Sequence, residues 1–119
     1  MSKETSIVLQ KSTDFALRII KMYKHLSTTK RETILSKQVL RSGTGISANL
    51  TEAYSGASKK DFLAKVYIAF KESSETAHWL FLLHKSDYLT QLEFDSINAD
   101  CKEIENMLAK TIKTLKSGS

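Results

Sequence analysis

Glu75 and His78 have the residue types and the spacing of a metal site. A carboxylate and an imidazole three residues apart lie on one face of a helix, and two such Glu-x-x-His pairs hold a di-iron centre in some helical bundles. This sequence contains one such pair and no second copy. His84 follows His78 by six residues, about 240° around a helix, and cannot share its edge. A metal-dependent bundle enzyme is therefore the weakest hypothesis, and no metal or cofactor is predicted.

Other side chains that could support catalysis are placed unfavourably. Cys101 falls on the apolar seam of a predicted helix, which favours an inert buried thiol over a reactive one. The segment Gly43-Thr44-Gly45 lacks the lysine and the preceding strand that a phosphate-binding loop requires. No combination of serine, histidine and aspartate suggests a catalytic triad. The chain is therefore predicted not to be an enzyme and to have no catalytic residues.

The segment from Arg41 to Ala53 places small and polar residues inside a predicted helix. Each glycine in a helix costs about 1 kcal/mol relative to alanine, so Gly43 and Gly45 need a compensating role. We expect their lack of bulk to let another helix approach closely. Arg41 and Glu52 lie eleven residues apart, about 16 Å along the axis, and cannot pair with each other. Each is expected to pair with another helix or another subunit, as a buried charge.

Basic residues form the second candidate site. Residues 1–71 carry 13 Lys and Arg against 5 Asp and Glu, whereas residues 72–119 carry 5 against 8. This asymmetry suggests a basic face for a polyanion and an acidic face for a different contact, although ordinary solvated helices explain the charges equally well. The residues predicted to bind nucleic acid are Arg18, Lys21, Lys24, Lys30, Arg31, Lys59, Lys60 and Lys65. Because no aromatic residue is interleaved with them, structured or duplex nucleic acid fits better than single strands.

The composition predicts long helices. The 119 residues include no proline, four glycines and one cysteine, so few residues interrupt regular structure. One cysteine excludes an internal disulfide framework, and neither a signal peptide nor a run of 18 apolar residues is present. We therefore expect one cytoplasmic domain over residues 1–119, without a membrane partner.

Four amphipathic helices must position the candidate groups. Apolar residues recur at three- and four-residue spacing in segments of about 12–27, 34–54, 58–86 and 90–116. For the first helix a start as early as Ser6 is an alternative, since Ile7-Val8-Leu9 fits either a first helical turn or an extended arm. Ser58 and Thr90 are expected to cap the third and fourth helices, and Gly56 to end the second in a left-handed cap. Short connections then give an all-α, up-down-up-down four-helix bundle.

The third predicted helix has more apolar surface than a monomer can bury. Around Trp79-Leu80-Phe81-Leu82-Leu83 every direction is apolar, which is typical of a buried helix. A four-helix monomer exposes one side of each helix, so the sequence predicts a homo-oligomer. The residues predicted to serve structure or an interface are Arg41, Ser42, Gly45, Asn49, Glu52, Glu75 and Trp79.

The sequence resembles the bacterial four-helix-bundle proteins encoded within 23S rRNA intervening sequences. The motifs that carry the resemblance are Leu40-Arg41-Ser42, Ile46-Ser47-Ala48-Asn49 with Glu52, Ser58-Lys59-Lys60-Asp61-Phe62, and the spacing of Ala69, Ser73, Glu75 and Leu80. The match spans about residues 12–116, and one departure is Ala53, where many relatives carry glycine.

This resemblance implies a bundle that assembles as a ring, with a homopentamer as the expected size. It also implies a structural or interface role for the polar residues Arg41, Ser42, Asn49, Glu52 and Glu75. The chain is similar, in addition, to the accessory variability proteins of diversity-generating retroelements, which share the fold and contact a reverse transcriptase and nucleic acid.

Two main hypotheses follow. The first is a non-enzymatic, ring-forming bundle that binds rRNA or another structured nucleic acid through basic residues. The second is a protein-interaction scaffold or accessory subunit that binds no nucleic acid and whose partner docks on the acidic last helix. Salt separates them, because phosphate contacts weaken steeply as salt rises.

Overall fold

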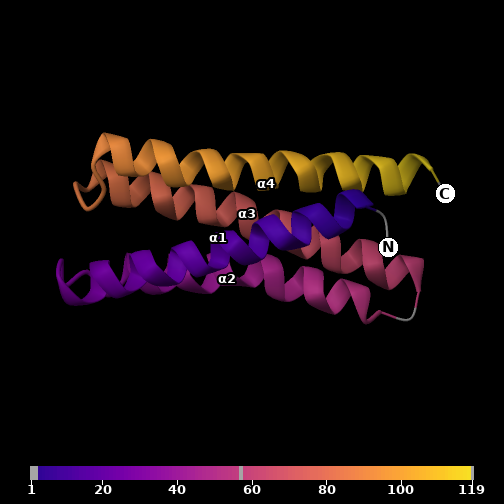
Figure 1. Cartoon of the computed structure of the whole chain (residues 1–119), viewed down its shortest axis with the longest axis horizontal. Helices are drawn as coiled ribbons and strands as arrows, with labels where there is room; N and C mark the ends of the chain where they lie inside the picture. Colours follow the sequence, from indigo (N-terminus) through magenta and orange to yellow (C-terminus); the bar gives the residue numbers. More distant parts are fainter. Residues whose placement is uncertain (1–2, 57, 119) are drawn as a thin grey trace.

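The computed structural model describes residues 3–56 and 58–118. They form four helices: α1 (Lys3–Thr28), α2 (Leu35–Tyr54), α3 (Lys59–Lys85) and α4 (Gln91–Ser117). Successive helices run in opposite directions along a rod of 47 × 22 × 19 Å. In Figure 1 the α1–α2 and α3–α4 loops lie at one end, and the start of α3 lies with the end of α4 at the other. The predicted all-α, up-down-up-down bundle is confirmed.

Helix α1 begins at Lys3, before the predicted start near residue 12 and also before the alternative start at Ser6. The reason is a buried face that continues toward the N-terminus, where Val8, Ser12 and Phe15 are each at most 2% exposed. The Ser12 hydroxyl donates to the Leu9 carbonyl at 3.0 Å, so its burial leaves no unsatisfied donor. The first turns of α1 therefore belong to the bundle.

Both predicted N-terminal caps are present. The Ser58 hydroxyl accepts the Asp61 N–H at 3.1 Å and begins α3. At the start of α4, the Thr90 hydroxyl accepts the Glu93 N–H at 3.1 Å, and the Glu93 carboxylate accepts the Thr90 N–H at 2.9 Å. This reciprocal pair is the capping box that the sequence predicts, and it satisfies two donors that the helix itself cannot.

The predicted left-handed cap at Gly56 is wrong. No glycine among the described residues has a positive φ, and α2 ends at Ser55 with φ −93°. The left-handed positions belong instead to Arg31 (φ 56°) and Asp87 (φ 69°), in the α1–α2 and α3–α4 loops. An aspartate tolerates this conformation better than most side chains, whereas the arginine must be held there by its surroundings.

Glu32 holds the α1–α2 loop against the start of α2. Its carboxylate accepts the backbone N–H groups of Ile34, Leu35 and Ser36 at 3.2, 3.1 and 2.7 Å. The Ser36 hydroxyl donates to the Glu32 carbonyl at 2.6 Å, and Glu32 is only 8% exposed. A carboxylate at this position satisfies orphan donors and interacts favourably with the positive end of the helix dipole. This cap was not predicted from the sequence.

The core runs the length of the rod and contains the seam residues of all four helices. Its largest fully buried side chains include Ile19, Leu26, Ile46, Leu50, Leu80, Leu83, Ile104 and Leu108. Cys101 belongs to the same core, and its thiol lies 3.4 Å from the Ser73 carbonyl. Burial raises the pKa of this thiol to about 12. A thiol that keeps its proton is a poor nucleophile, which agrees with the inert cysteine expected from the sequence.

The apolar run of α3 is only partly covered within one chain. Leu80 and Leu83 are fully buried, Trp79 and Leu82 are half-buried, and Phe81 is 47% exposed. The other large apolar residues exposed in the described chain are Ile7, Leu17, Ile34, Tyr67, Ile68 and Leu92. In the described part of the chain, no helix combines the length and the apolar character needed to cross a membrane.

Candidate functional site

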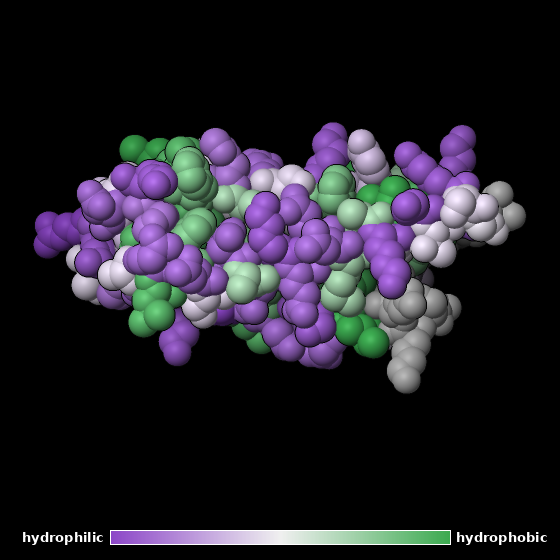
Figure 2. All heavy atoms as spheres, turned by 90° about the horizontal axis from the view of Figure 1, so that it is seen from above, coloured by the Kyte–Doolittle hydropathy of each residue, from purple (hydrophilic) through white to green (hydrophobic). Residues whose placement is uncertain are grey.

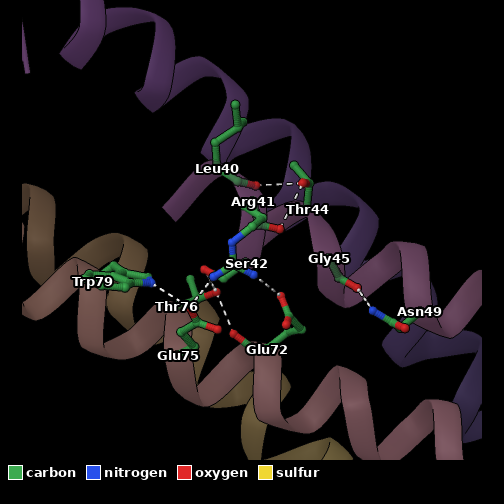
Figure 3. Close-up of polar contacts among 10 residues, drawn as sticks. All are labelled: Leu40, Arg41, Ser42, Thr44, Gly45, Asn49, Glu72, Glu75, Thr76 and Trp79. Carbon is green, nitrogen blue, oxygen red and sulfur yellow. Dashed lines mark hydrogen bonds and ion pairs between the residues drawn. The ribbon is translucent and has the colours of Figure 1, made fainter. Parts of the chain in front are cut away.

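A layer of polar side chains joins α2 to α3 near the middle of the rod (Figure 3). The Arg41 guanidinium on α2 donates through Nη2 to Glu75 Oε1 on α3, and its Nη1 lies 3.6 Å from Glu72 Oε2. The Trp79 indole N–H donates to the same Glu75 oxygen at 3.1 Å. The expectation that Arg41 pairs with another helix is correct, and the partner helix belongs to the same chain.

Glu72 is the more enclosed of the two carboxylates that face Arg41. Its side chain is 19% exposed, compared with 35% for Glu75 and 54% for Arg41. Burial raises the pKa of Glu72, the charge of Arg41 lowers it, and the charge of Glu75 raises it, with a net increase. One arginine thus serves two acids one helical turn apart, which favours a proton on Glu72 as pH falls.

Two fully buried hydroxyls lie beside this layer. The oxygens of Ser42 on α2 and Thr76 on α3 are 2.8 Å apart, and Thr76 Oγ1 is also 2.8 Å from the Glu72 carbonyl. A carbonyl can only accept, so the Thr76 hydrogen points to Glu72 and the Ser42 hydroxyl donates to Thr76. Both hydroxyls are satisfied without water.

The glycines of α2 explain how the helices approach so closely. A Cβ at Gly43 would lie 3.0 Å from both Cγ atoms of Ile19 on α1. A Cβ at Gly45 would lie 2.6 Å from Glu72 Oε2 on α3. The Asn49 amide donates to the Gly45 carbonyl at 2.8 Å, so this residue supports α2 internally. The predicted close approach is therefore made by two neighbouring helices of the same chain.

Glu52 pairs with Lys65, and neither is buried. Their charged atoms lie 3.1 Å apart, with 60% and 37% of the two side chains exposed. Arg41, at 54%, is exposed as well. The expectation that Arg41 and Glu52 are buried charges is therefore wrong for a single chain. An exposed pair contributes little to stability, so Lys65 is an ion-paired surface residue rather than a free cation.

The residues predicted to bind nucleic acid do not form one surface in this chain. Lys59, Lys60 and Lys65 lie at the start of α3, whereas Lys30 and Arg31 lie in the α1–α2 loop at the opposite end. The remaining three, Arg18, Lys21 and Lys24, lie in the second half of α1.

Carboxylates partly neutralise the α1 group. Arg18 pairs with Asp100 at 2.8 Å and also donates to the carbonyl and hydroxyl of Ser96. The Thr90 backbone N–H lowers the pKa of Glu93 most, and the nearby charges of His25 and Lys30 lower it further. Arg18 and Lys30 therefore lie near acids of α4, which weakens their field toward a polyanion.

The opposite end of the rod concentrates positive charge. Antiparallel packing places the first half of α3 beside the last turns of α4, and these two segments together carry seven lysines. We call this set the lysine pole: Lys59, Lys60, Lys65, Lys71, Lys110, Lys113 and Lys116. Residues 58–71 and 106–118 carry one carboxylate side chain, Asp61, and Glu52 of α2 is paired with Lys65.

The lysine pole corrects the expected division into a basic and an acidic half-chain. The acids of α4 end at Glu105, and Lys110, Lys113 and Lys116 follow it. None of these three lysines was among the residues predicted from the sequence to bind nucleic acid. Figure 2, which views the rod from the α4 side, shows a largely hydrophilic surface interrupted by separate hydrophobic patches.

Glu75 and His78 have different contacts on α3. Glu75 is bonded to Arg41 and Trp79, while the exposed His78 ring lies 5.5 Å from the Trp79 ring. Glu72, Thr76 and Glu32 are polar residues that the sequence analysis did not single out. The acidic pair at 72 and 75, one turn apart on a mostly apolar helix, is the signal that could have pointed to the first of them.

Comparison with known proteins places these observations in context. The family model described as 23S rRNA-intervening sequence protein matches residues 4–110. The fold is similar to the crystal structure of a protein with unknown function from the S23 ribosomal protein family of Bacteroides thetaiotaomicron VPI-5482. The TM-score is 0.91 and the identity 45%, over 93% of this chain and 99% of the other. No curated protein matches this chain.

Proposed function

The chain belongs to the 23S rRNA-intervening sequence protein family, and on that premise we propose that it is a non-enzymatic, self-associating bundle that binds structured RNA or DNA. The lysine pole is the proposed binding surface. This proposal refines the sequence-based hypothesis, since it keeps the residues at the start of α3, adds the end of α4, and assigns no direct role to the α1 residues.

The observation that carries the proposal is the excess of lysine over carboxylate at this pole. Six of its seven lysines have no carboxylate ion pair among the described residues; the seventh, Lys65, pairs with Glu52. Ammonium groups on flexible stems suit the phosphate backbone, which presents closely spaced charges and no fixed sequence. Such contacts position a nucleic acid without reading its bases.

The arrangement of the other polar groups supports a non-enzymatic role. Arg41, Glu75 and Trp79 bond to one another, and Ser42 bonds to Thr76 in the interior. Cys101 is buried with its pKa raised to about 12. Each of these groups serves packing between helices.

Self-association is the second part of the proposal. Trp79 and Leu82 on α3 are partly exposed apolar residues, and Ile34, just before α2, is 76% exposed. A neighbouring copy that covers these side chains would also bury Arg41 and Glu75 in their pairs, which fixes register. A ring is the expected form of the assembly, with five copies as its expected size.

The alternative, a protein scaffold with an acidic docking face on α4, has less support. Asp100 pairs with Arg18, and Glu103 pairs with Lys11 at 3.2 Å. Glu105 is bonded to Lys102 and Ser74. These acids therefore already have partners within the chain.

A matched pair of charge reversals tests the binding surface. The triple variant Lys60→Glu, Lys113→Glu and Lys116→Glu changes the lysine pole, and Lys21→Glu, Lys24→Glu and Lys30→Glu makes the same charge change elsewhere. Affinity for a short RNA duplex is measured by fluorescence anisotropy at low salt. We expect the first variant to lose about tenfold or more and the second to lose much less. Equal losses, or a larger loss in the second variant, would reject the lysine pole as the surface.

A further inference from the structure

The exposed face of α3 carries cationic and aromatic residues in alternation. We call this set the α3 stripe: Lys60, Tyr67, Lys71, His78, Phe81 and Lys85. Successive members are separated by seven, four, seven, three and four residues, so all lie on one side of the helix. All six are exposed. The stripe shares Lys60 and Lys71 with the lysine pole and extends from there toward the opposite end of the rod.

Tyr67 lies between two ammonium groups. The residue is 46% exposed, and Lys71 Nζ and Lys116 Nζ lie 6.0 Å and 5.9 Å from the centre of its ring. Beside it is a shallow hollow of about 470 Å³ with a mainly apolar lining that includes Leu63, Ala64 and Ile68. Aromatic surface is thus available to a flat ligand, with positive charge on either side of it.

Phe81 repeats this arrangement farther along α3. It is 47% exposed, and Lys85 Nζ lies 5.7 Å from its ring centre. The hollow next to it lies between α3 and α4 and is lined in part by His78, Phe94 and Lys102. Fourteen residues separate the two rings, which corresponds to about 21 Å along the helix.

We infer that the α3 stripe binds an unpaired stretch of nucleic acid, with bases stacked on Tyr67 and Phe81 and phosphates near Lys60, Lys71, Lys85 and Lys116. The inference rests on the proposed function, which gives nucleic acid as the ligand, and adds that the bound part of the nucleic acid is unpaired. A duplex hides the faces of its bases, whereas a loop or single strand offers them to aromatic side chains.

The charges around the stripe favour this ligand over an apolar protein segment. Glu105 lies beside the stripe, but its carboxylate is bonded to Lys102 and Ser74, so Lys102 offsets its negative charge. Glu75, on the same helix, is bonded to Arg41. Alternating aromatic and cationic groups match the alternation of base and phosphate in a strand. This corrects the sequence-based expectation that no aromatic residue is interleaved with the basic ones.

Truncation of each ring provides the test. The probes are a fluorescein-labelled oligouridine of about 16 nucleotides and a blunt RNA duplex of the same length. We expect Tyr67→Ala and Phe81→Ala each to weaken oligouridine binding by about tenfold and to change duplex binding by less than about twofold. Tyr67→Phe should keep the affinity, because it keeps the ring. Leu92→Ala is the control, since it removes a side chain that is 82% exposed but lies outside the stripe.

The two proposals fail in different ways. If the unaltered protein binds both probes and the ring truncations leave the ratio of the two affinities unchanged, the α3 stripe is rejected and the lysine pole stands. If the unaltered protein binds neither probe, both the proposed function and this inference are rejected.

Photocrosslinking of the unaltered protein tests the α3 stripe without any substitution, so the test also holds if a variant alters folding or assembly. Oligouridine carrying 5-iodouridine is crosslinked by light to the unaltered full chain, and the modified peptides are located by mass spectrometry. Adducts on Tyr67 or Phe81 are the expected result. Adducts confined to peptides outside α3 would overturn the inference.

Discussion

The hydroxyl oxygens of Ser42 and Thr76 lie 2.8 Å apart in the interior, between helices α2 and α3. Both residues are fully buried, and one hydrogen bond between them satisfies groups that water cannot reach. The exposed Arg41–Glu75 contact lies one residue before this pair on each helix. Together the two contacts fix the register of α2 against α3.

The first prediction concerns the hydroxyl pair. Thr76→Val leaves the Ser42 hydroxyl buried without its partner and should lower the free energy of unfolding by about 1–3 kcal/mol. The double variant Ser42→Ala with Thr76→Val removes both polar groups and should recover part of that loss. Urea unfolding of the four proteins of this cycle measures the coupling. Strictly additive effects of the two substitutions would show that the pair is not coupled.

The second prediction separates the two glycines of α2. Gly43→Ala pushes a methyl group toward the branched side chain of Ile19, which is fully buried and cannot swing away. We expect it to destabilise the protein by about 1–3 kcal/mol. Gly45→Ala meets only the flexible end of Glu72, so the gain in helix propensity of up to about 1 kcal/mol should offset the disturbance.

Thermal unfolding of the two alanine variants provides the comparison. A larger loss of stability at position 45 than at position 43 would contradict the packing described for α2.

The third prediction follows from the raised pKa of Glu72, for which burial is the largest cause. A carboxyl group whose pKa is higher in the folded state contributes stability below its unfolded pKa, and that contribution is lost as pH rises through the folded pKa. Glu72→Gln removes this dependence. The stability of Glu72→Gln relative to the unaltered protein should therefore increase from pH 4 to pH 7.

Chemical unfolding at a series of pH values checks this sign. The absolute effect of Glu72→Gln at one pH is less informative, because the variant also loses the contact with Arg41. A relative stability that stays flat, or that falls as pH rises, would refute the assignment.

The fourth prediction concerns self-association through the partly exposed side chains around Trp79. Trp79→Asp introduces a charge beside Glu75, and Gly45→Leu adds bulk over Glu72; both should reduce the oligomer mass before or together with the loss of folding. Leu92→Asp is the control, because Leu92 lies on α4 and is 82% exposed. Light scattering combined with circular dichroism follows mass and helicity. Unchanged mass in both Trp79→Asp and Gly45→Leu would reject the proposed interface.

Periodicity in the sequence was sufficient to predict the fold. The spacing of Ile97, Cys101, Ile104 and Leu108 alone predicts a helix with one buried face, and each of these residues is at most 3% exposed. Caps at Ser58 and Thr90 were equally predictable, because the partner group lies three residues away. Glu32 was not, since its carboxylate bonds to N–H groups beyond a loop whose path the sequence does not specify.

The candidate site was predictable only in part. The polar residues Arg41 and Glu75 stand out on their helices, but their pairing depends on the register between α2 and α3. The charge of each half of the chain did not predict the basic surface, because Lys60 and Lys116 lie at the same end of the rod although their sequence positions are 56 apart. Antiparallel packing, rather than sequence proximity, creates the lysine pole.

The salt dependence of binding to a structured RNA tests the central claim most directly. Affinity of the unaltered protein for a short RNA hairpin is measured over a series of salt concentrations. If the lysine pole contacts at least three phosphates, the logarithm of the association constant should fall against the logarithm of salt concentration with a slope of about −2 or steeper. An affinity that does not change with salt, or no binding even at low salt, would contradict the account.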